Sequence, residues 1–381
     1  MPVLPIMVLL IGNYPADRQQ SMQRFAIMLL QGLTAAGIPA EMIQPQPYLG
    51  RIQVAGSFVA KWFGYIDKFL LFPWQLRRRL SASVGVVHIC DHSNAMYGAH
   101  VKSQPVVISC HDLLAVRGAL GEQTDSPASL TGKVLQRWIV AGLEKADLIV
   151  CASQATLADV QRLVSRENGR PKLEVITLGL SYPYRKLPSE EARARLAASS
   201  IIDPDTPFVL HVGSNLSRKN RAGVLRIFAR CKEKWNGSLV FAGEPLTESF
   251  RSLGRQLGIA DRVVEVPETA NELLEALYNC ATALLFPSTR EGFGWPVAEA
   301  HACGCPVICA DREPMIEVAG GAGLRHPIDD EAGFAADLLR LTNPLERERE
   351  SVKALENAKR FSAARMISEY GELYRTLTPA S

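Results

Sequence analysis

The feature that most constrains the fold of this chain is a repeated alternation of short apolar runs with segments of helical periodicity. Residues 5–11 form a continuous apolar run of strand length. Residues 19–36 follow with apolar side chains on one helical face, namely Met22, Phe25, Ala26, Leu29, Leu30 and Leu33. Gly37 is placed as the C-terminal cap of that helix. This alternation predicts a parallel sheet covered by helices, an α/β fold.

The same rhythm occurs in two blocks. Further strands are predicted at 84–89, 105–109, 146–151 and 173–178, and then at 208–212, 238–242, 263–266, 283–286 and 307–310. In the second block, helices are predicted at 221–234, 249–257, 271–279 and 296–302. Gly, Tyr, Pro and Ser cluster between the blocks, near 179–185. We therefore expect a first domain of residues 1–183 and a second domain that begins at 184.

Composition narrows the class of protein. A chain of 381 residues fits two domains of ordinary size. The 42 basic and 39 acidic residues nearly balance, which argues against a general nucleic-acid partner. No apolar run approaches the roughly 20 residues of a membrane span, and the N-terminus lacks the positive charge of a secretory signal. The eight cysteines form no C-x-x-C pair, so we expect free thiols and a cytoplasmic location.

A first candidate site spans residues 213–220, directly after a predicted strand. Gly213 opens a turn of small residues that leads into a helix N-terminus, where free N–H groups and the helix dipole favour an anion. Arg218 and Lys219 add two cations, so a diphosphate is the natural ligand, and we expect Lys219 to be exposed. The alternative is a solvated, basic helix start.

A second candidate site spans residues 291–299. Gly292 and Gly294 let the backbone approach a ligand closely, and a proline then suits the first turn of a helix. Glu291 and Glu299 bracket this turn, and carboxylates accept several hydrogen bonds from sugar or ribose hydroxyls. The alternative is a surface loop with one helix-capping glutamate.

These residues strongly resemble the family-4 retaining glycosyltransferases, which have the GT-B fold of two facing Rossmann-like domains with a cleft between them. Glu291 and Glu299 match the family's E-x7-E motif, and residues 218–220 match its phosphate-binding R-K-N stretch. The likeness covers most of the second domain and extends more weakly to the first. The last segment resembles the family's final helix, which packs back on the first domain. The resemblance therefore implies that the second domain spans 184–360 and that 361–381 returns to the first domain.

The resemblance implies a role for each matching residue. Arg218 and Lys219 would bind the donor diphosphate, Glu299 the ribose, and Glu291 the transferred sugar. His111 would face that sugar from the first domain, although a lone histidine can also be structural. Gly12 would approach the phosphates, but Asn13 stands where the family often has a second glycine. The residues expected to bind the donor are Gly12, Gly213, Asn220, Val266, Gly292, Phe293, Gly294 and Glu299.

The chemistry that the resemblance implies is transfer of a sugar from a nucleoside-diphosphate donor to a glycan or lipid-linked acceptor. Negative charge develops on the departing diphosphate, and fixed cations stabilise it, so no metal or other cofactor is expected. Anomeric configuration would be retained, by front-side attack assisted by the leaving phosphate. Two alternatives remain: a GT-B sugar-nucleotide epimerase, which consumes donor without acceptor, and a non-catalytic protein that binds nucleotide sugars without turnover.

Three other patterns could suggest a metal, and we interpret each as structural. His88 and His92 have a four-residue offset but lie on a strand that runs into a loop, not on a helix. The spacing of His301, Cys303 and Cys305 matches no common zinc pattern. The D-x-D string at 203–205 lies among prolines and predicts a turn.

Residues 51–80 are rich in aromatic and basic side chains. This segment has six basic residues against Asp67 alone. Its aromatic residues are Phe58, Trp62, Phe63, Tyr65, Phe69, Phe72 and Trp74. Such a mixture suits peripheral contact with an anionic membrane at its inner face. It is equally compatible with acceptor binding or helix packing.

Overall fold

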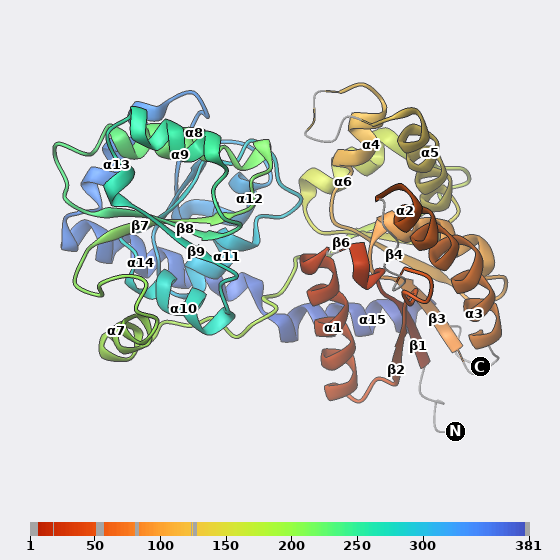
Figure 1. The fold of residues 1–381 in the computed structure, drawn as a ribbon. Coiled ribbons are helices and arrows are strands. Elements are labelled where there is room, and N and C mark those ends of the chain that lie inside the picture. Colours follow the sequence, from red (N-terminus) through yellow and green to blue (C-terminus); the bar gives the residue numbers. More distant parts are fainter. Residues whose placement is uncertain are drawn as a thin grey trace. The chain divides into compact units, whose positions relative to one another are not determined.

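The computed structural model describes residues 7–377, apart from 18, 51–56, 81–83, 123 and 125–127, and for 57–61 only the backbone is described. The chain divides into two compact units (Figure 1). Unit 1 comprises Met1–Ser181 and Ala363–Ser381, and unit 2 comprises Tyr182–Ser362. The boundaries between the units, at 181/182 and 362/363, each lie two residues from the expected boundaries at 183/184 and 360/361. The last helix, α15 (Ala363–Leu377), belongs to unit 1 and contacts α1 (Gln20–Ala35).

Within the described residues, unit 1 is built on a six-stranded parallel sheet of order β2-β1-β3-β4-β5-β6. The strands are β1 (Met7–Ile11), β2 (Ala40–Ile43), β3 (Val84–Ile89), β4 (Val106–Cys110), β5 (Leu148–Cys151) and β6 (Lys172–Val175). The chain adds β2 on one side of β1 and then β3 on the other. Ligands of open α/β sheets bind beyond the carboxyl ends of the strands at such a switch point.

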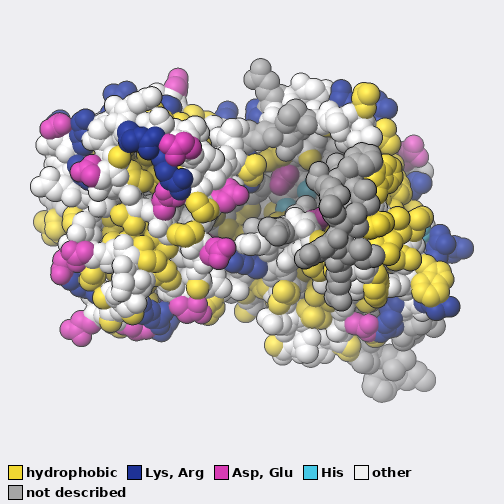
Figure 2. Space-filling model, viewed as in Figure 1, with side chains coloured by type: hydrophobic (Ala, Val, Ile, Leu, Met, Phe, Trp, Pro, Cys, Tyr) yellow, Lys and Arg dark blue, Asp and Glu magenta, His cyan; other side chains and the backbone are white. Residues whose placement is uncertain are grey.

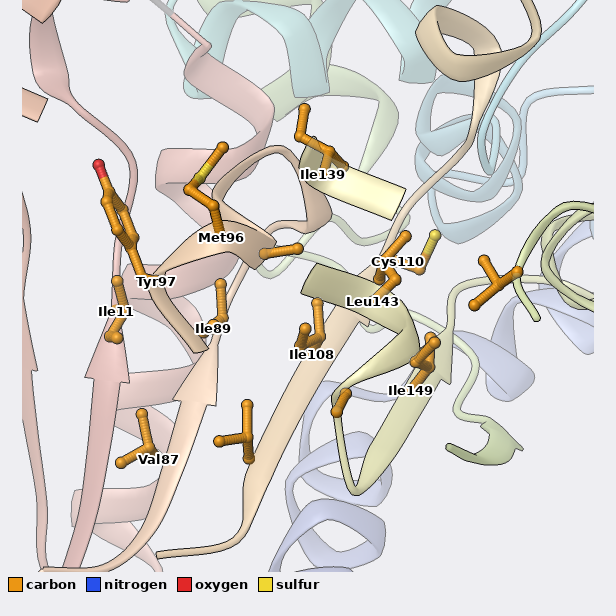
Figure 3. Packing of buried hydrophobic residues seen from close by; sticks show 14 of the residues in the cluster. Ile11, Val87, Ile89, Met96, Tyr97, Ile108, Cys110, Ile139, Leu143 and Ile149 are labelled. Carbon is orange, nitrogen blue, oxygen red and sulfur yellow. The ribbon is translucent and has the colours of Figure 1, made fainter. Parts of the chain in front are cut away.

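Helices cover both faces of this sheet (Figure 1). Besides α1 and α15 they are η1 (Pro15–Asp17), α2 (Ser57–Ile66), η2 (Asp67–Leu71), α3 (Phe72–Arg79), η3 (His92–His100), α4 (Leu114–Ala119), α5 (Leu130–Glu144) and α6 (Gln154–Leu163). Figure 3 shows Ile89 and Ile108 of neighbouring strands packed with Met96 of η3 and Leu143 of α5. This apolar core fixes the strand ends that carry the polar residues of unit 1.

Unit 2 repeats the plan with a six-stranded parallel sheet of order β12-β11-β10-β7-β8-β9 among the described residues. Its strands are β7 (Phe208–Gly213), β8 (Ser238–Gly243), β9 (Val263–Pro267), β10 (Ala283–Phe286), β11 (Val307–Ala310) and β12 (Gly323–His326). The order reverses between β7 and β10, which pair directly. The two candidate motifs follow these two strands, so both lie at the switch point.

The helical elements of unit 2 lie on both sides of the sheet (Figure 1). They are α7 (Ser189–Ala198), η4 (Ser217–Lys219), α8 (Arg221–Ala229), α9 (Glu248–Gln256), η5 (Ala260–Arg262), α10 (Asn271–Cys280), α11 (Trp295–Ala302), α12 (Met315–Ala319), η6 (Gly320–Ala322), α13 (Glu331–Arg340), α14 (Pro344–Ala358) and η7 (Lys359–Phe361). Among the residues the structure covers, no helix has the length and apolar character needed to cross a bilayer.

The predicted α/β alternation is confirmed, with differences at some ends. The helix expected over 221–234 ends at Ala229, because the chain continues in turns and Trp235 folds back onto Phe228, with ring centroids 6.2 Å apart. The strand expected over 173–178 ends at Val175. The edge strands β2 and β12 were not predicted, because neither contains a fully buried residue and their apolar signal is weak.

Candidate functional site

The switch point of unit 2 brings the two sequence motifs into contact. Backbone hydrogen bonding joins the loops that follow β7 and β10: the Thr289 N–H donates to the carbonyl of Arg218 at 2.7 Å. The side-chain amide of Asn220 donates to the carbonyl of Pro287 at 3.2 Å. Residues more than 60 positions apart in the sequence are therefore held together by neighbouring strands and direct contacts.

A three-residue ion cluster occupies this junction, formed by Arg218, Lys219 and Glu291. The Lys219 ammonium donates to Glu291 Oε1 at 2.6 Å, and Arg218 Nη1 donates to Oε2 at 2.5 Å. One carboxylate thus bridges both cations that the sequence assigned to a diphosphate. The sequence places all three residues in the site, but it does not show that they pair with one another.

Lys219 is buried, with only 7% of its surface exposed, so the expectation of an exposed lysine was wrong. Its ammonium lies 4.9 Å from the centre of the Phe286 ring, a cation–π contact. Gly213 makes room for the stem of the side chain, since a Cβ there would lie 3.2 Å from Lys219 Cδ. The small residue at the end of β7 is therefore needed for packing around the lysine.

Burial and pairing act against each other in this cluster. Burial by itself would raise the pKa of Glu291, but Lys219 and Arg218 outweigh it and hold that pKa below its ordinary value. Burial lowers the pKa of Lys219, and the Glu291 carboxylate offsets part of that effect. The Glu291 carboxylate is therefore ionised near neutral pH.

Asn220 and Arg221 shape the turn from within. Asn220 has φ of 50° in the left-handed region, and its side-chain oxygen caps α8 by accepting from the Gly223 N–H at 3.2 Å. Arg221 is buried and donates to the carbonyls of Gly213 at 2.5 Å and Glu244 at 2.8 Å. Burial lowers the pKa of Arg221 to about 10. Sequence reasoning missed Arg221, because nothing in its local pattern distinguishes it from a solvated arginine.

The second carboxylate, Glu299, lies one turn into α11 and is also buried. The Tyr278 hydroxyl on α10 donates to Glu299 Oε2 at 2.8 Å and orients it. Gly294 precedes the helix with φ of 101°, and a Cβ there would lie 3.3 Å from Met315 Sδ. This position therefore favours glycine. Tyr278 was not predicted, since it is one apolar-face residue among many in its helix.

Two other predicted donor-binding residues have their side chains turned into the protein. Phe293 is buried and packs edge-on against Phe361, with ring centroids 5.8 Å apart. Val266 is buried at the end of β9, an edge strand that β8 separates from β7. Their backbones, not their side chains, are what these positions can offer to a ligand.

The switch point of unit 1 carries a different polar cluster. Asn13 follows β1 and Asp91 follows β3, and the Asn13 amide donates to Asp91 Oδ2 at 2.6 Å. His92 Nδ1 lies 3.1 Å from Asp91 Oδ1. Gly12 lies against the loop after β2, where a Cβ would meet Gln44 Oε1 at 2.9 Å. Asn13, which the sequence presented only as a departure from the family pattern, is thus a central member of this cluster.

His111 follows β4 and is buried beside this cluster. Its Nε2–H donates to the carbonyl of Cys90 at 2.9 Å, and the Phe25 ring lies edge-on at 4.7 Å. Burial lowers the pKa of His111, so the ring is neutral and Nδ1 keeps its lone pair. No residue that the structure describes donates a hydrogen bond to Nδ1. His111 can therefore accept one more hydrogen bond.

The remaining candidate motifs have structural partners. His88 bonds to the hydroxyls of Tyr374 at 2.6 Å and Ser109 at 2.9 Å, and His301 bonds to Asn357 at 2.9 Å. The D-x-D string forms a turn in which the Asp203 carboxylate accepts from the backbone N–H two residues on. Over the described part of the chain, no three His, Cys, Asp or Glu side chains gather as metal ligands.

The aromatic segment divides between core and surface. Its residues 51–56 and the side chains of 57–61 lie outside the described part, Phe58 included. Phe72 is buried, whereas Trp62, Leu70 and Trp74 are more than half exposed. Figure 2 shows hydrophobic side chains gathered over the region of α3 and α5, with basic side chains beside them. The outer face of α5 adds the exposed residues Leu130, Val134 and Trp138.

Comparisons with known proteins bear on the whole chain. The family model of the glycosyl transferases group 1 matches residues 192–354, and that of glycosyltransferase family 4 matches residues 22–180. The D-inositol 3-phosphate glycosyltransferase of Corynebacterium efficiens is 27% identical over 288 residues, 72% of this chain and 66% of that protein. O-antigen chain mannosyltransferase B of Escherichia coli is 25% identical over 253 residues, 64% and 65% of the two chains. The matches span less than two thirds of these relatives.

Solved structures agree over nearly the full length. Sucrose-phosphate synthase from Thermosynechococcus elongatus has a TM-score of 0.76 at 20% identity, covering 99% of this chain and 100% of that one. WaaG, a glycosyltransferase involved in lipopolysaccharide biosynthesis, has a TM-score of 0.72 at 16% identity, covering 97% and 99%. With the two six-stranded parallel sheets, this likeness confirms the predicted two-domain α/β GT-B fold.

Proposed function

This chain belongs to the glycosyltransferases of group 1 and family 4, and we propose that it transfers a sugar from a nucleoside-diphosphate donor to a hydroxyl of a glycan or lipid-linked acceptor. The observation that carries the proposal is the ion cluster of Arg218, Lys219 and Glu291 at the switch point of unit 2. Two cations, one of them buried, meet there at the carboxyl ends of parallel strands. That is where open α/β sheets bind their ligands.

In the proposed reaction, the bond between the anomeric carbon and the diphosphate oxygen breaks. Negative charge develops on the departing diphosphate, and Arg218 and Lys219 stabilise it in a site of low dielectric. The acceptor oxygen bonds to the same face of the anomeric carbon, and its proton passes to the leaving phosphate. Configuration is thereby retained. The two side-chain cations supply the charge that a metal would otherwise provide, so the reaction needs no metal.

The other polar groups have positioning roles in this proposal. The Glu299 carboxylate, oriented by Tyr278, accepts hydrogen bonds from the ribose hydroxyls of the donor. His111 offers its Nδ1 lone pair to a sugar hydroxyl, because its other nitrogen is committed to the Cys90 carbonyl. Relatives support the substrate class: one solved structure, HepE from Anabaena, is in complex with UDP and glucose.

Two alternatives make different predictions. An epimerase of this fold would consume the donor without any acceptor, which analysis of the sugar products would reveal. A non-catalytic binding protein would bind the donor without turnover. We favour catalysis over mere binding because the residues that the resemblance assigns to the reaction are all present, namely Glu291, Glu299, Arg218 and Lys219.

The test is calorimetric titration of the purified protein with UDP, GDP, ADP and their common sugar conjugates, with and without EDTA. We expect one nucleotide to bind the wild type with micromolar affinity, and EDTA should not change that affinity. The Arg218→Ala variant should bind the same nucleotide at least about tenfold more weakly. Arg230→Ala, an exposed arginine that pairs with Glu331, serves as the matched control. Binding of none of these nucleotides would contradict the proposal.

We also propose that unit 1 meets an anionic lipid surface, which places a lipid-linked acceptor nearby. The outer face of α5 presents Leu130 and Val134, 83% and 64% exposed, beside the exposed Lys133 and Arg137. In α3 the guanidinium of Arg78 stacks 3.7 Å from the centre of the Trp74 ring. Apolar side chains flanked by cations are typical of helices that lie in the headgroup region.

Sedimentation with vesicles tests this surface. The protein should bind vesicles of phosphatidylcholine with phosphatidylglycerol more strongly than phosphatidylcholine alone, and Leu130→Glu with Val134→Glu should reduce binding about tenfold or more. Leu345→Glu with Val352→Glu is the matched control, since this pair on α14 is similarly exposed, at 73% and 59%. An equal loss in both double variants would contradict a role for α5.

A further inference from the structure

We propose that Glu291 makes the donor site discriminate between the intact nucleotide sugar and the spent nucleoside diphosphate. This inference rests on the proposed function and assigns the site a second property. In addition to contacting the transferred sugar, the carboxylate opposes any diphosphate that arrives without one. It thereby limits inhibition of the enzyme by its own product.

The geometry gives Glu291 direct access to both phosphate-binding cations. Its two carboxylate oxygens lie 2.6 Å from the Lys219 ammonium and 2.5 Å from Arg218 Nη1. The Glu291 side chain is only 7% exposed, so solvent ions screen its charge little. A diphosphate that binds these cations must therefore lie within a few ångströms of a fixed negative charge.

Two consequences follow for a bare nucleoside diphosphate. Its terminal phosphate carries more negative charge than the esterified phosphate of a nucleotide sugar, so the Glu291 carboxylate repels it more strongly. It also competes with Glu291 for the N–H donors of Arg218 and Lys219. A buried carboxylate that loses such donors without replacement becomes markedly less stable.

An intact donor compensates for both effects. Its sugar hydroxyls can donate to the Glu291 oxygens while the diphosphate takes up the cations. Glu291 thereby exchanges one set of hydrogen-bond donors for another. Specificity is a difference between two affinities, and here the repulsive element acts against the product.

The experiment compares binding of the nucleoside diphosphate and of its sugar conjugate to the wild type and to Glu291→Gln, using the nucleotide among UDP, GDP and ADP that the wild type binds. Removing the charge should tighten diphosphate binding about tenfold or more and leave binding of the sugar conjugate unchanged or weaker. The ratio of the two dissociation constants should therefore shift at least about tenfold. Glu291→Ala should shift it in the same direction.

Glu331→Gln is the matched control. Glu331 also bridges two basic side chains, Arg226 at 2.5 Å and Arg230 at 3.4 Å, but it joins α13 to α8 and takes no part in the candidate site. In Glu331→Gln, the ratio of the dissociation constants for the nucleoside diphosphate and its sugar conjugate should equal that of the wild type. An unchanged ratio in both Glu291 variants, or an equal weakening of both ligands, would overturn the inference while nucleotide binding itself still supports the proposed function. Absence of nucleotide binding to the wild type would overturn both.

Discussion

The two units share the same sheet topology but carry different side chains at their switch points. Each has a parallel sheet whose strand order reverses beside its first strand, and each gathers polar residues at that switch point. In unit 2 the gathered groups are charged, with Glu291 paired to Lys219 and Arg218. In unit 1 they include the Asp91 carboxylate, to which the Asn13 amide donates, and a neutral His111, without a lysine or arginine among the residues named in that cluster. The fold therefore determines where these polar groups gather, and the local sequence determines their charge.

This difference suggests a division of labour. The two side-chain cations of unit 2 suit a diphosphate, whereas a neutral imidazole with a lone pair suits a hydroxyl group. If this division is right, substitutions at the switch point of unit 2 should change nucleotide affinity. Substitutions at the switch point of unit 1 should change turnover and leave nucleotide affinity unchanged. The following predictions are ordered from the largest expected effect to the smallest.

Lys219→Ala should have the largest effect, because it removes a buried cation and leaves Glu291 with Arg218 alone. We expect turnover to fall about 100- to 1,000-fold and nucleotide affinity to fall with it. Breaking a buried pair should also cost about 3 kcal/mol of stability. Steady-state kinetics, calorimetry and thermal melting measure the three effects. Lys234→Ala, an exposed lysine in the same unit, should change none of them; full activity in Lys219→Ala would refute the role.

His111→Ala should lower turnover about 100-fold, because a hydroxyl of the substrate would lose its acceptor. Affinity for the nucleoside diphosphate should stay within about twofold of the wild type, since the proposed site of that ligand lies in unit 2. Kinetics with donor and acceptor, set beside calorimetry with the diphosphate alone, separate the two effects. A parallel loss of both quantities would break the proposed division between the units.

Acidification should destabilise both units through buried neutral histidines. Burial lowers the pKa of His88 in unit 1 and of His211 in unit 2, each to about 3. Between pH 6.5 and 3 the unfolded chain binds these protons and the folded chain does not. The free energy of unfolding should therefore decrease as the pH is lowered through this window, by up to about 1.4 kcal/mol per pH unit for each histidine.

Denaturant unfolding at pH 7.5, 6 and 5 measures this slope. His211→Gln and His88→Gln each remove one titrating ring. Each variant should therefore lower the dependence of the unfolding free energy on pH by the equivalent of up to one bound proton. His92 acts in the opposite direction: burial lowers its pKa, but Asp91 outweighs burial and raises it, so its contribution is lost as pH rises. A stability that increases steadily from pH 7.5 to 5 would contradict the dominance of the buried neutral rings.

Tyr374→Phe should have the smallest effect and should act on unit 1. The hydroxyl of Tyr374 bonds to His88 at 2.6 Å and helps to hold α15 against the sheet. Its loss should cost about 1–2 kcal/mol of stability, with nucleotide affinity unchanged. Urea denaturation followed by circular dichroism measures the change. A large drop in nucleotide affinity would show that docking of this helix also affects the donor site.

The sequence alone determined the plan of the molecule and the positions of its charged motifs. The periodicity of apolar residues depends on local spacing, so it predicted the central strands. The first boundary between the units was placed by the cluster of Gly, Tyr, Pro and Ser near 179–185, two residues from the observed division. The periodicity underpredicted the edge strands β2 and β12, whose half-exposed residues give little periodic signal. Residues 218–220 and 291–299 were singled out because strand, turn and helix start are adjacent in sequence.

Only the tertiary structure decided how those residues pair. Lys219 is buried because β7 and β10 are neighbours, and Glu291, 72 positions away, then lies within hydrogen-bond distance. Tyr278 reaches Glu299 because α10 packs against α11, and Asn13 reaches Asp91 because β1 and β3 are neighbours. The exposed apolar face of α5 likewise becomes visible only when the inner face is seen packed in the core. Sequence spacing specifies contacts within one element, whereas burial and charge pairing depend on contacts between elements distant in the chain.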